Sequence, residues 1–234
     1  MKLTAGERDV LRVLESQRRT VSRGTMLRRE RDPADGMWVL QSGWAASALG
    51  MPDGSRQITK VHLPGDVVGT PGGALNGGVE TVSMLTSGIV SPFPRSVLTT
   101  VFRDHQRLAA LFFVLVQVER VSLSDRIASI GRTDARARVA ALLLDLTHRL
   151  RLTNPAMEDR LSLPMTQEDI GDTVGLTAVH VNRMMRALAD DGLIARGPGS
   201  IRLLDEPGLA RISGYISRWS SPDTSWLPEP PEDA

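Results

Sequence analysis

The residues best suited to chemistry lie between Thr166 and Leu188, where arginine and asparagine recur within a helical pattern. An apolar stripe at i, i+3, i+4 and i+7 spacing is formed by Val181, Met184, Met185 and Leu188. Because such a stripe must be buried, the opposite face of the helix carries Asn182 and Arg183 into solvent. Arginine and asparagine form paired hydrogen bonds with guanine and adenine in the major groove. The chemistry predicted here is therefore the recognition of DNA bases.

A second, shorter helix is predicted immediately before this one. Thr166 is a suitable N-cap, and Asp169 stands three residues later, where a capping-box partner belongs. Gly175 ends the first helix, and Thr177 can cap the second. The two helices form a helix-turn-helix, in which Gly171 lets the backbones approach closely. For the spacing alone, an ordinary helical hairpin with a solvated face is an equal alternative.

The residues after the second helix favour DNA binding over that alternative. Residues 193–196 and 200–204 are predicted as two short strands around Gly197-Pro198-Gly199, which makes a β-wing. In a winged helix-turn-helix the wing tip and the helix N-termini hold phosphates while the recognition helix contacts bases. Arg196 and Arg202 are available to contact phosphates.

The segment QEDIGDTVGLTAVHVNRMMRALADDGLI, residues 167–194, resembles the DNA-binding segment of the Crp/Fnr family of bacterial transcription regulators. The resemblance extends over residues 10–215, because the upstream glycine placement is similar to the β-roll sensor of that family. It implies an α+β fold with an N-terminal antiparallel β-roll sensor domain, a long dimerisation helix and a C-terminal winged helix-turn-helix domain.

The resemblance also implies roles for single residues. Arg183 matches a family arginine that contacts guanine, whereas Val179 replaces the frequent glutamate that contacts cytosine. We assign base recognition to Val179, Asn182 and Arg183, so the operator should differ from the best-known operators of the family. Phosphate or flanking contacts are expected from Thr166, Thr177, Ala178, His180, Arg186 and Arg196.

Residues 19–94 consist of short apolar runs separated by glycine and proline, which is typical of an antiparallel β-roll or sandwich. In family members that bind cyclic AMP, an acidic residue holds the ribose and an Arg-Ser pair holds the phosphate. Asp66 fits the first role, but the second position falls near Gly78 and Val79, beside Glu80 and without an arginine. Cyclic AMP is therefore disfavoured. A long turn, rather than a phosphate cradle, is the interpretation of the glycines at 72, 73, 77 and 78.

A long helix is predicted from Asp104 to Ile130, apolar on two faces. One seam consists of Leu108, Leu111, Leu115 and Val118, and the other of Phe112, Val116, Leu123 and Ile130. One of the two is expected to cover the β-roll and the other to pair with a second copy in a two-fold dimer. A helix buried within one monomer is the alternative. In the family this helix carries effector contacts, and Ser122 and Ser124 lie near the corresponding place.

These patterns divide the chain into four parts. Residues 1–103 are the expected sensor domain and residues 104–132 the dimerisation helix, with a hinge at 131–134. Residues 133–216 form the expected DNA-binding domain. Residues 217–234, rich in proline and acidic side chains, are expected to be disordered.

Composition narrows the class of protein. With 234 residues and 41% hydrophobic residues, the chain can form two small domains. The absence of cysteine excludes disulfides, thiolate zinc sites and an all-cysteine iron–sulfur cluster, and it fits the cytoplasm. Neither a long apolar run nor a signal peptide is present, so no membrane association is expected.

No catalytic signature is present. The histidines at 62, 105, 148 and 180 are scattered without metal-ligand spacing, and no nucleophile motif or paired carboxylates occur. We therefore expect no enzyme and no metal or other cofactor, although haem or a small effector is not excluded. The expected partners are double-stranded DNA, a second copy of the chain and, for an activator, RNA polymerase. The alternatives are an effector-independent DNA-binding protein whose β-roll is only a scaffold, and a ligand-binding β-roll with a non-functional helix-turn-helix.

Overall fold

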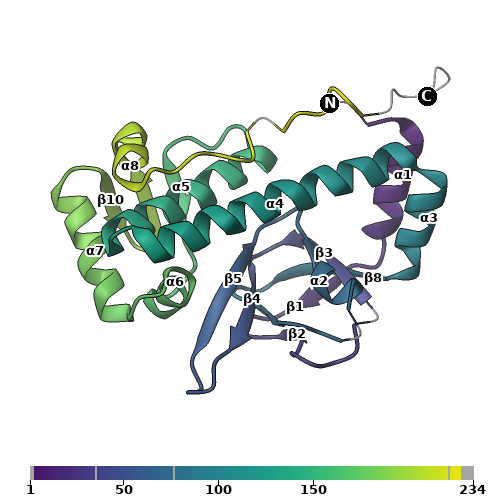
Figure 1. Ribbon diagram of the computed structural model, residues 1–234, viewed down its shortest axis with the longest axis horizontal. Helices are drawn as coiled ribbons and strands as arrows, with labels where there is room; N and C mark the ends of the chain where they lie inside the picture. Colours follow the sequence, from purple (N-terminus) through teal and green to yellow (C-terminus); the bar gives the residue numbers. More distant parts are fainter. Residues whose placement is uncertain (1–2, 35, 76, 221, 228–234) are drawn as a thin grey trace. The chain divides into compact units, whose positions relative to one another are not determined.

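The computed structural model describes residues 3–34, 36–75, 77–220 and 222–227 of the chain (Figure 1). These residues divide into two compact units, each with its own core. The first unit draws on residues 1–47, 62–121 and 221–234, and the second on residues 48–61 and 122–220. Among the described helices, none is both long and apolar enough to cross a membrane.

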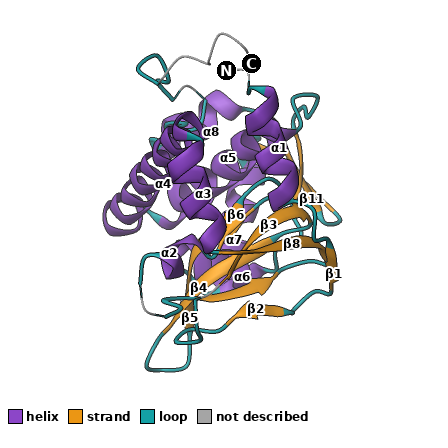
Figure 2. Cartoon of the chain, turned by 90° about the vertical axis from the view of Figure 1, so that its right-hand side faces the viewer, coloured by secondary structure: helices purple, strands orange, loops and turns teal. Residues whose placement is uncertain are grey.

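Two antiparallel sheets, drawn in orange in Figure 2, form the β-roll. Most of their residues belong to the first unit, whereas the hairpin residues 48–61 belong to the second. One sheet has the order β1 (Arg19–Val21), β8 (Gly88–Pro94), β3 (Gly36–Ser42) and β6 (Val67–Val68). The other has the order β2 (Met26–Arg28), β7 (Thr81–Met84), β4 (Ala45–Gly50) and β5 (Arg56–His62). Apolar side chains fill the core, among them Leu40, Ala45, Val68, Val82, Met84 and Val90. The predicted β-roll is confirmed, and a one-turn helix α2 (Thr70–Gly73) follows β6.

Helix α1 (Ala5–Leu14) begins at a complete capping box, in which Thr4 and Glu7 exchange hydrogen bonds with each other's backbone N–H groups. Glu7 has a second role, because its carboxylate accepts hydrogen bonds of 2.7 and 2.9 Å from Arg107 Nη1. Both residues are buried. The ion pair therefore ties α1 to a residue 100 positions further along the chain.

The expected long helix is α4 (Gln106–Arg132), and a separate helix that was not predicted, α3 (Ser96–Asp104), precedes it. His105, with φ −132° and ψ 64°, separates them, and no glycine or proline marks this break in the sequence. At its other end α4 continues through Gly131 to Arg132, so only Thr133 and Asp134 connect it to α5. The expected hinge at 131–134 is therefore shorter than the sequence indicated.

The apolar faces of α4 also differ from the predicted seams. Leu108 is buried as expected, but Leu115, assigned to the same seam, is 48% exposed. Periodicity reveals that a helix has two apolar faces without saying which residues meet a partner. An exposed apolar row remains on α4, formed by Phe113, Val116, Leu123 and Ile127.

The second unit contains the predicted winged helix-turn-helix. Its elements after α4 are α5 (Ala135–Thr153), β9 (Arg160–Ser162), α6 (Gln167–Val174), α7 (Ala178–Asp190), β10 (Ile194–Gly197), β11 (Ser200–Leu203) and α8 (Glu206–Ser213). The three strands form one sheet in the order β10-β11-β9. Arg151 on α5 pairs with Glu206 at the start of α8 at 2.6 Å, and the hydrogen bond from Arg151 lowers the pKa of Glu206.

The segment near the C-terminus has side-chain contacts in the first unit. Trp226 lies edge-on to Phe113, with ring centroids 6.5 Å apart, and Leu227 is buried. Residues 228–234 lie outside the described residues, so the disorder expected for the end of the chain stays a prediction.

Candidate nucleic-acid interface

Capping residues fix the two helices of the helix-turn-helix. Thr166 Oγ1 accepts a hydrogen bond from Asp169 N at 3.0 Å, and Asp169 Oδ2 accepts one from Thr166 N at 2.8 Å, which confirms the predicted capping box. Gly175 ends α6 with φ +69°, in the left-handed region that glycine tolerates. Thr177 Oγ1 then accepts a hydrogen bond from His180 N at the start of α7.

The turn between these helices leaves no room for a side chain at Gly171. A Cβ atom there would lie 2.3 Å from the carbonyl oxygen of Leu176, whose N–H donates to Gly171 O at 3.0 Å. The close approach predicted for this glycine is confirmed.

We expect Gly171→Ala to lower the free energy of unfolding by about 1–3 kcal/mol, because the new methyl group collides with fixed backbone. Urea unfolding of the full chain measures the change. Gly131→Ala is the matched control, because a Cβ there meets nothing within 4 Å. Equal stability of the two variants would contradict the tight helix contact.

Helix α7 buries one face and exposes the other. Val181, Met185 and Leu188 are buried, as the apolar stripe predicted, whereas Met184 is only half-buried. Exposed side chains on the opposite face and at the helix start are Thr177, Ala178, Val179, Arg183 and Arg186. His180 and Asn182 flank them and are half-buried. Val179 is 83% exposed, the largest exposed fraction among the exposed large apolar residues that the structure describes.

The arginines of this surface are available to a ligand. In the described part of the chain, Arg183, Arg186 and Arg196 form no ion pair with a carboxylate. Arg196 is exposed on β10, whose antiparallel pairing with β11 forms the wing. Arg202 differs from the prediction, because it pairs with Asp159 at 2.8 Å and its hydrogen bond lowers the pKa of that carboxyl. The positive surface therefore centres on α7 and the wing tip.

Two of the proposed effector residues of the first unit, Asp66 and Gly78, form hydrogen bonds with backbone groups of nearby residues. Asp66 Oδ2 accepts from Leu63 N at 3.1 Å, and the backbone of Gly78 forms hydrogen bonds with Arg31 N and Asp32 O. Val79 and Glu80 are half-buried beside this loop. The roles of these residues in effector binding stay predictions.

A buried arginine fills the glycine-rich turn. Arg28 of β2 donates to Gly69 O at 3.0 Å and to Gly36 O, and its guanidinium lies 5.1 Å from the ring centroid of Trp38. A Cβ at Gly72 would lie 2.5 Å from Arg28 Nη1, and one at Gly78 would lie 2.8 Å from Arg28 Cδ. These glycines therefore make space for a side chain of the protein itself, which supports the interpretation of the run as a turn. Sequence reasoning missed Arg28 because it lies 41 residues before Gly69.

A polar network joins β4 and β5 to Glu80, the residue before β7. Ser47 Oγ lies 2.8 Å from His62 Nε2 and donates to Glu80 Oε1 at 2.7 Å, while His62 Nδ1 is 3.9 Å from Asp66 Oδ2. Ser47 and His62 are fully buried, so water and substrates do not reach the hydroxyl. Among the described residues no group of three or more His, Cys, Asp and Glu side chains is placed to hold a metal.

The serines proposed on α4 lie in the second unit. Ser122 lines a cavity of about 370 Å³ together with residues of α4, α5, the end of α6 and the segment after α8, whereas Ser124 is exposed. Tyr215 lies on the wall of this cavity, and burial raises the pKa of its hydroxyl.

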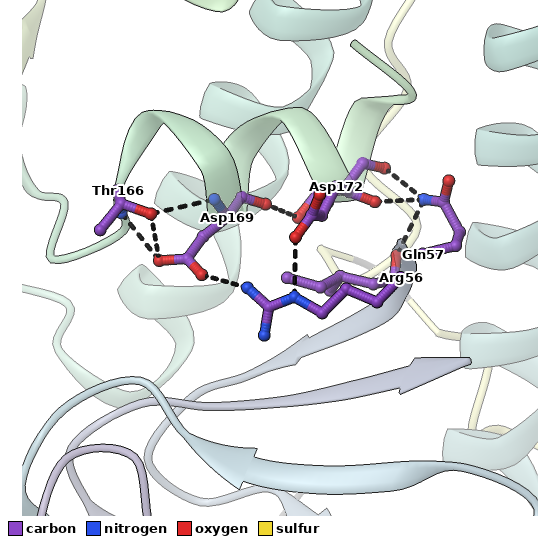
Figure 3. Close-up of polar contacts among 7 residues, drawn as sticks. Arg56, Gln57, Thr166, Asp169 and Asp172 are labelled. Carbon is purple, nitrogen blue, oxygen red and sulfur yellow. Dashed lines mark hydrogen bonds and ion pairs between the residues drawn. The ribbon is translucent and has the colours of Figure 1, made fainter. Parts of the chain in front are cut away.

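Sequence reasoning also missed Arg56, the first residue of β5. Its guanidinium forms 2.7 Å ion pairs with both Asp169 and Asp172 of α6 (Figure 3). Burial lowers the pKa of Arg56, but the hydrogen bonds to the two carboxylates outweigh it and raise the pKa overall. No local signal marks a contact across 116 residues of sequence.

The two predicted domains both match models of known protein families. Residues 137–212 match the Crp-like helix-turn-helix domain, and residues 18–105 match the cyclic nucleotide-binding domain. The nitrogen fixation regulation protein FixK of Azorhizobium caulinodans is 33% identical over 182 residues, which cover 76% of this chain and 72% of that protein. This chain belongs to the Crp/Fnr family of transcription regulators.

Other Crp/Fnr proteins are similar over a longer span. The transcriptional regulatory protein Btr of Bordetella pertussis is 29% identical over 215 residues, covering 92% of this chain and 88% of that protein. The solved structure of FixK2 from Bradyrhizobium japonicum has a TM-score of 0.77 at 26% identity, covering 86% of this chain and 98% of that one. As a Crp/Fnr regulator, the chain carries its DNA-binding domain in the helix-turn-helix of the second unit.

Proposed function

We propose that the protein acts as a homodimer that places one α7 helix in the major groove of each half of a pseudo-palindromic operator. The observation that carries the proposal is the exposed face of α7, where Val179 and Arg183 point into solvent while Val181 and Met185 are buried. Two-fold symmetry would place the half-sites about one helical turn apart, roughly 34 Å.

The exposed row on α4 supports the dimer. Phe113, Val116, Leu123 and Ile127 occupy a and d positions of a heptad pattern, and each is 42–64% exposed. Arg120 takes the remaining a position, where a charged residue typically sets register at a cost in stability. A second copy of α4 would cover this row in parallel.

We assign roles within the DNA complex by chemistry and position. Arg183 and Asn182 would form hydrogen bonds with base edges, and Val179 would contact a thymine methyl group. Phosphates would be held at the N-termini of α6 and α7 and at the wing, by Thr166, Thr177, Ala178, His180, Arg186 and Arg196. A cytoplasmic location, and RNA polymerase as partner for an activator, complete the proposal.

We expect Arg183→Ala to weaken binding to a selected operator by about 1–3 kcal/mol and to relax specificity at one base pair. Fluorescence anisotropy with duplexes enriched from a random library by the unaltered protein measures both effects. Arg23→Ala, which removes an equally charged, exposed side chain from the first unit, is the control. An equal loss on enriched and random duplexes would show that Arg183 contributes charge alone.

Effector control remains part of the proposal, with a ligand other than cyclic AMP. Arg28 favours the second candidate function, an effector-independent regulator, because it occupies the glycine-rich turn. Operator titrations of protein purified from its host, before and after removal of small molecules by unfolding and refolding, separate the two. A change in affinity indicates an effector, and constant affinity indicates a scaffold.

A further inference from the structure

The hairpin formed by β4 and β5 contacts the first helix of the helix-turn-helix through side chains. Asp169 and Asp172 stand three residues apart on α6 and therefore lie on the same face, one turn after the other. The guanidinium of Arg56 contacts the first through Nη2 and the second through Nε (Figure 3). A single side chain thus bridges two turns of α6.

The neighbouring Gln57 contacts the backbone at the end of the same helix. The last four carbonyl oxygens of a helix have no partner within it. In α6, Gly171 O accepts from Leu176 N, while Gln57 Nε2 donates to the carbonyl oxygens of Asp172 and Thr173. The hairpin therefore satisfies two of the acceptors that the helix itself leaves open.

Asp169 links this contact to the predicted DNA surface. Its Oδ2 accepts hydrogen bonds of 2.8 Å from both Thr166 N and Thr166 Oγ1, and its Oδ1 accepts one of 2.7 Å from Arg56. Thr166 is the N-cap at which we expect a phosphate contact. The same carboxylate that caps α6 is therefore held in orientation by Arg56.

Helix α6 depends on such support for two reasons. With eight residues it is too short to be stable by itself. The carboxylates of Asp169 and Asp172 are only 8% and 20% exposed, and Asp172 lies near the negative end of the helix dipole. Without Arg56, two partly desolvated negative charges would face each other on one side of α6.

We propose that Arg56 is a positioning residue for DNA recognition, which fixes α6 and thereby sets the orientation of α7. Because the Gly171 and Leu176 backbones are in contact, a tilt of α6 carries the start of α7 with it. Arg56 acts through the two carboxylates and not by touching DNA. This inference rests on the proposed function of the α7 surface.

The test measures affinity for an enriched duplex and for a random-sequence duplex at several salt concentrations. The full-length variants are Arg56→Ala, Asp172→Asn and the double variant, with Arg23→Ala as a charge-matched control. Circular dichroism establishes that each variant is folded. Asp172→Asn preserves shape and removes only one charge, so it remains informative if Arg56→Ala unfolds.

We expect Arg56→Ala to weaken binding to the enriched duplex about tenfold, with a smaller loss on random DNA. Asp172→Asn in the Arg56→Ala background should restore part of the affinity, because it removes the charge left without a partner. The dependence of affinity on salt should keep its slope, since no phosphate contact is lost.

Three results would overturn the positioning role without affecting the proposed function. The first is an unchanged affinity of Arg56→Ala for the enriched duplex, and the second is an equal loss of affinity on both duplexes. The third is a slope of affinity against salt that is lower by about one, with no affinity restored by Asp172→Asn in the Arg56→Ala background. The last result would mean that Arg56 contacts a phosphate directly. Failure of the unaltered protein to enrich any duplex would instead overturn the proposed function, and the positioning role with it.

Discussion

Ile127→Glu is expected to convert the protein to a monomer and to weaken operator binding by about 10²–10⁴-fold. Ile127 is 64% exposed at the C-terminal end of the apolar row on α4, where a second copy would bring its own Ile127 into contact. Two carboxylates buried at that position would repel each other and lose their hydration. A monomer contacts only one half-site. It therefore loses the additional affinity that a dimer gains when its two DNA-binding domains bind the same duplex.

Sedimentation analysis and anisotropy with the enriched duplex measure the two effects together. Val13→Glu is a closely matched control, since Val13 on α1 is also a 64% exposed aliphatic side chain. If Ile127→Glu remains a dimer with unchanged affinity, the copies associate through another surface.

The second large effect is expected at the ion pair of α1. Arg107→Met should lower the free energy of unfolding by about 3–5 kcal/mol, because it leaves the carboxylate of Glu7 buried without its charge partner. The side chains of Arg107 and Glu7 are only 10% and 6% exposed, so water cannot replace the lost contact. For a chain of this length the melting temperature should fall by about 6–20 °C.

A second substitution distinguishes charge from packing. Adding Glu7→Gln to Arg107→Met should recover much of the stability, because glutamine removes the charge and keeps the capping box with Thr4. Arg103→Ala should leave the unfolding curve unchanged, since that arginine is exposed beside Asp104. If the double variant is no more stable than the single one, the loss comes from packing and not from the charge on Glu7.

The sequence predicted the elements whose signals are local. Caps at Thr166 and Thr177, the glycine at 175 and the stripe through Val181 each operate within a few residues, and all four are confirmed. Helix α3 was not predicted, because no glycine or proline separates it from α4 at His105. Local patterns therefore predicted most of the elements but not every boundary.

Contacts between distant segments could not be predicted in this way. Arg28 and Arg56 act on residues 41 and 116 positions away, and the residues next to each of them in the sequence give no sign of these contacts. The absence of an arginine near Gly78 was correctly noted, yet Arg28 reaches the same turn from another strand. Only the fold brings such pairs together.

The second unit is assembled from two separate stretches of sequence, residues 48–61 and 122–220. A chimaera made by joining the amino-terminal half of one regulator to the carboxy-terminal half of another would keep Arg56 and lose Asp169 and Asp172, unless the donor carries equivalent acids. Grafting specificity between relatives therefore requires moving the hairpin together with the helices, although the two stretches are separated in the sequence.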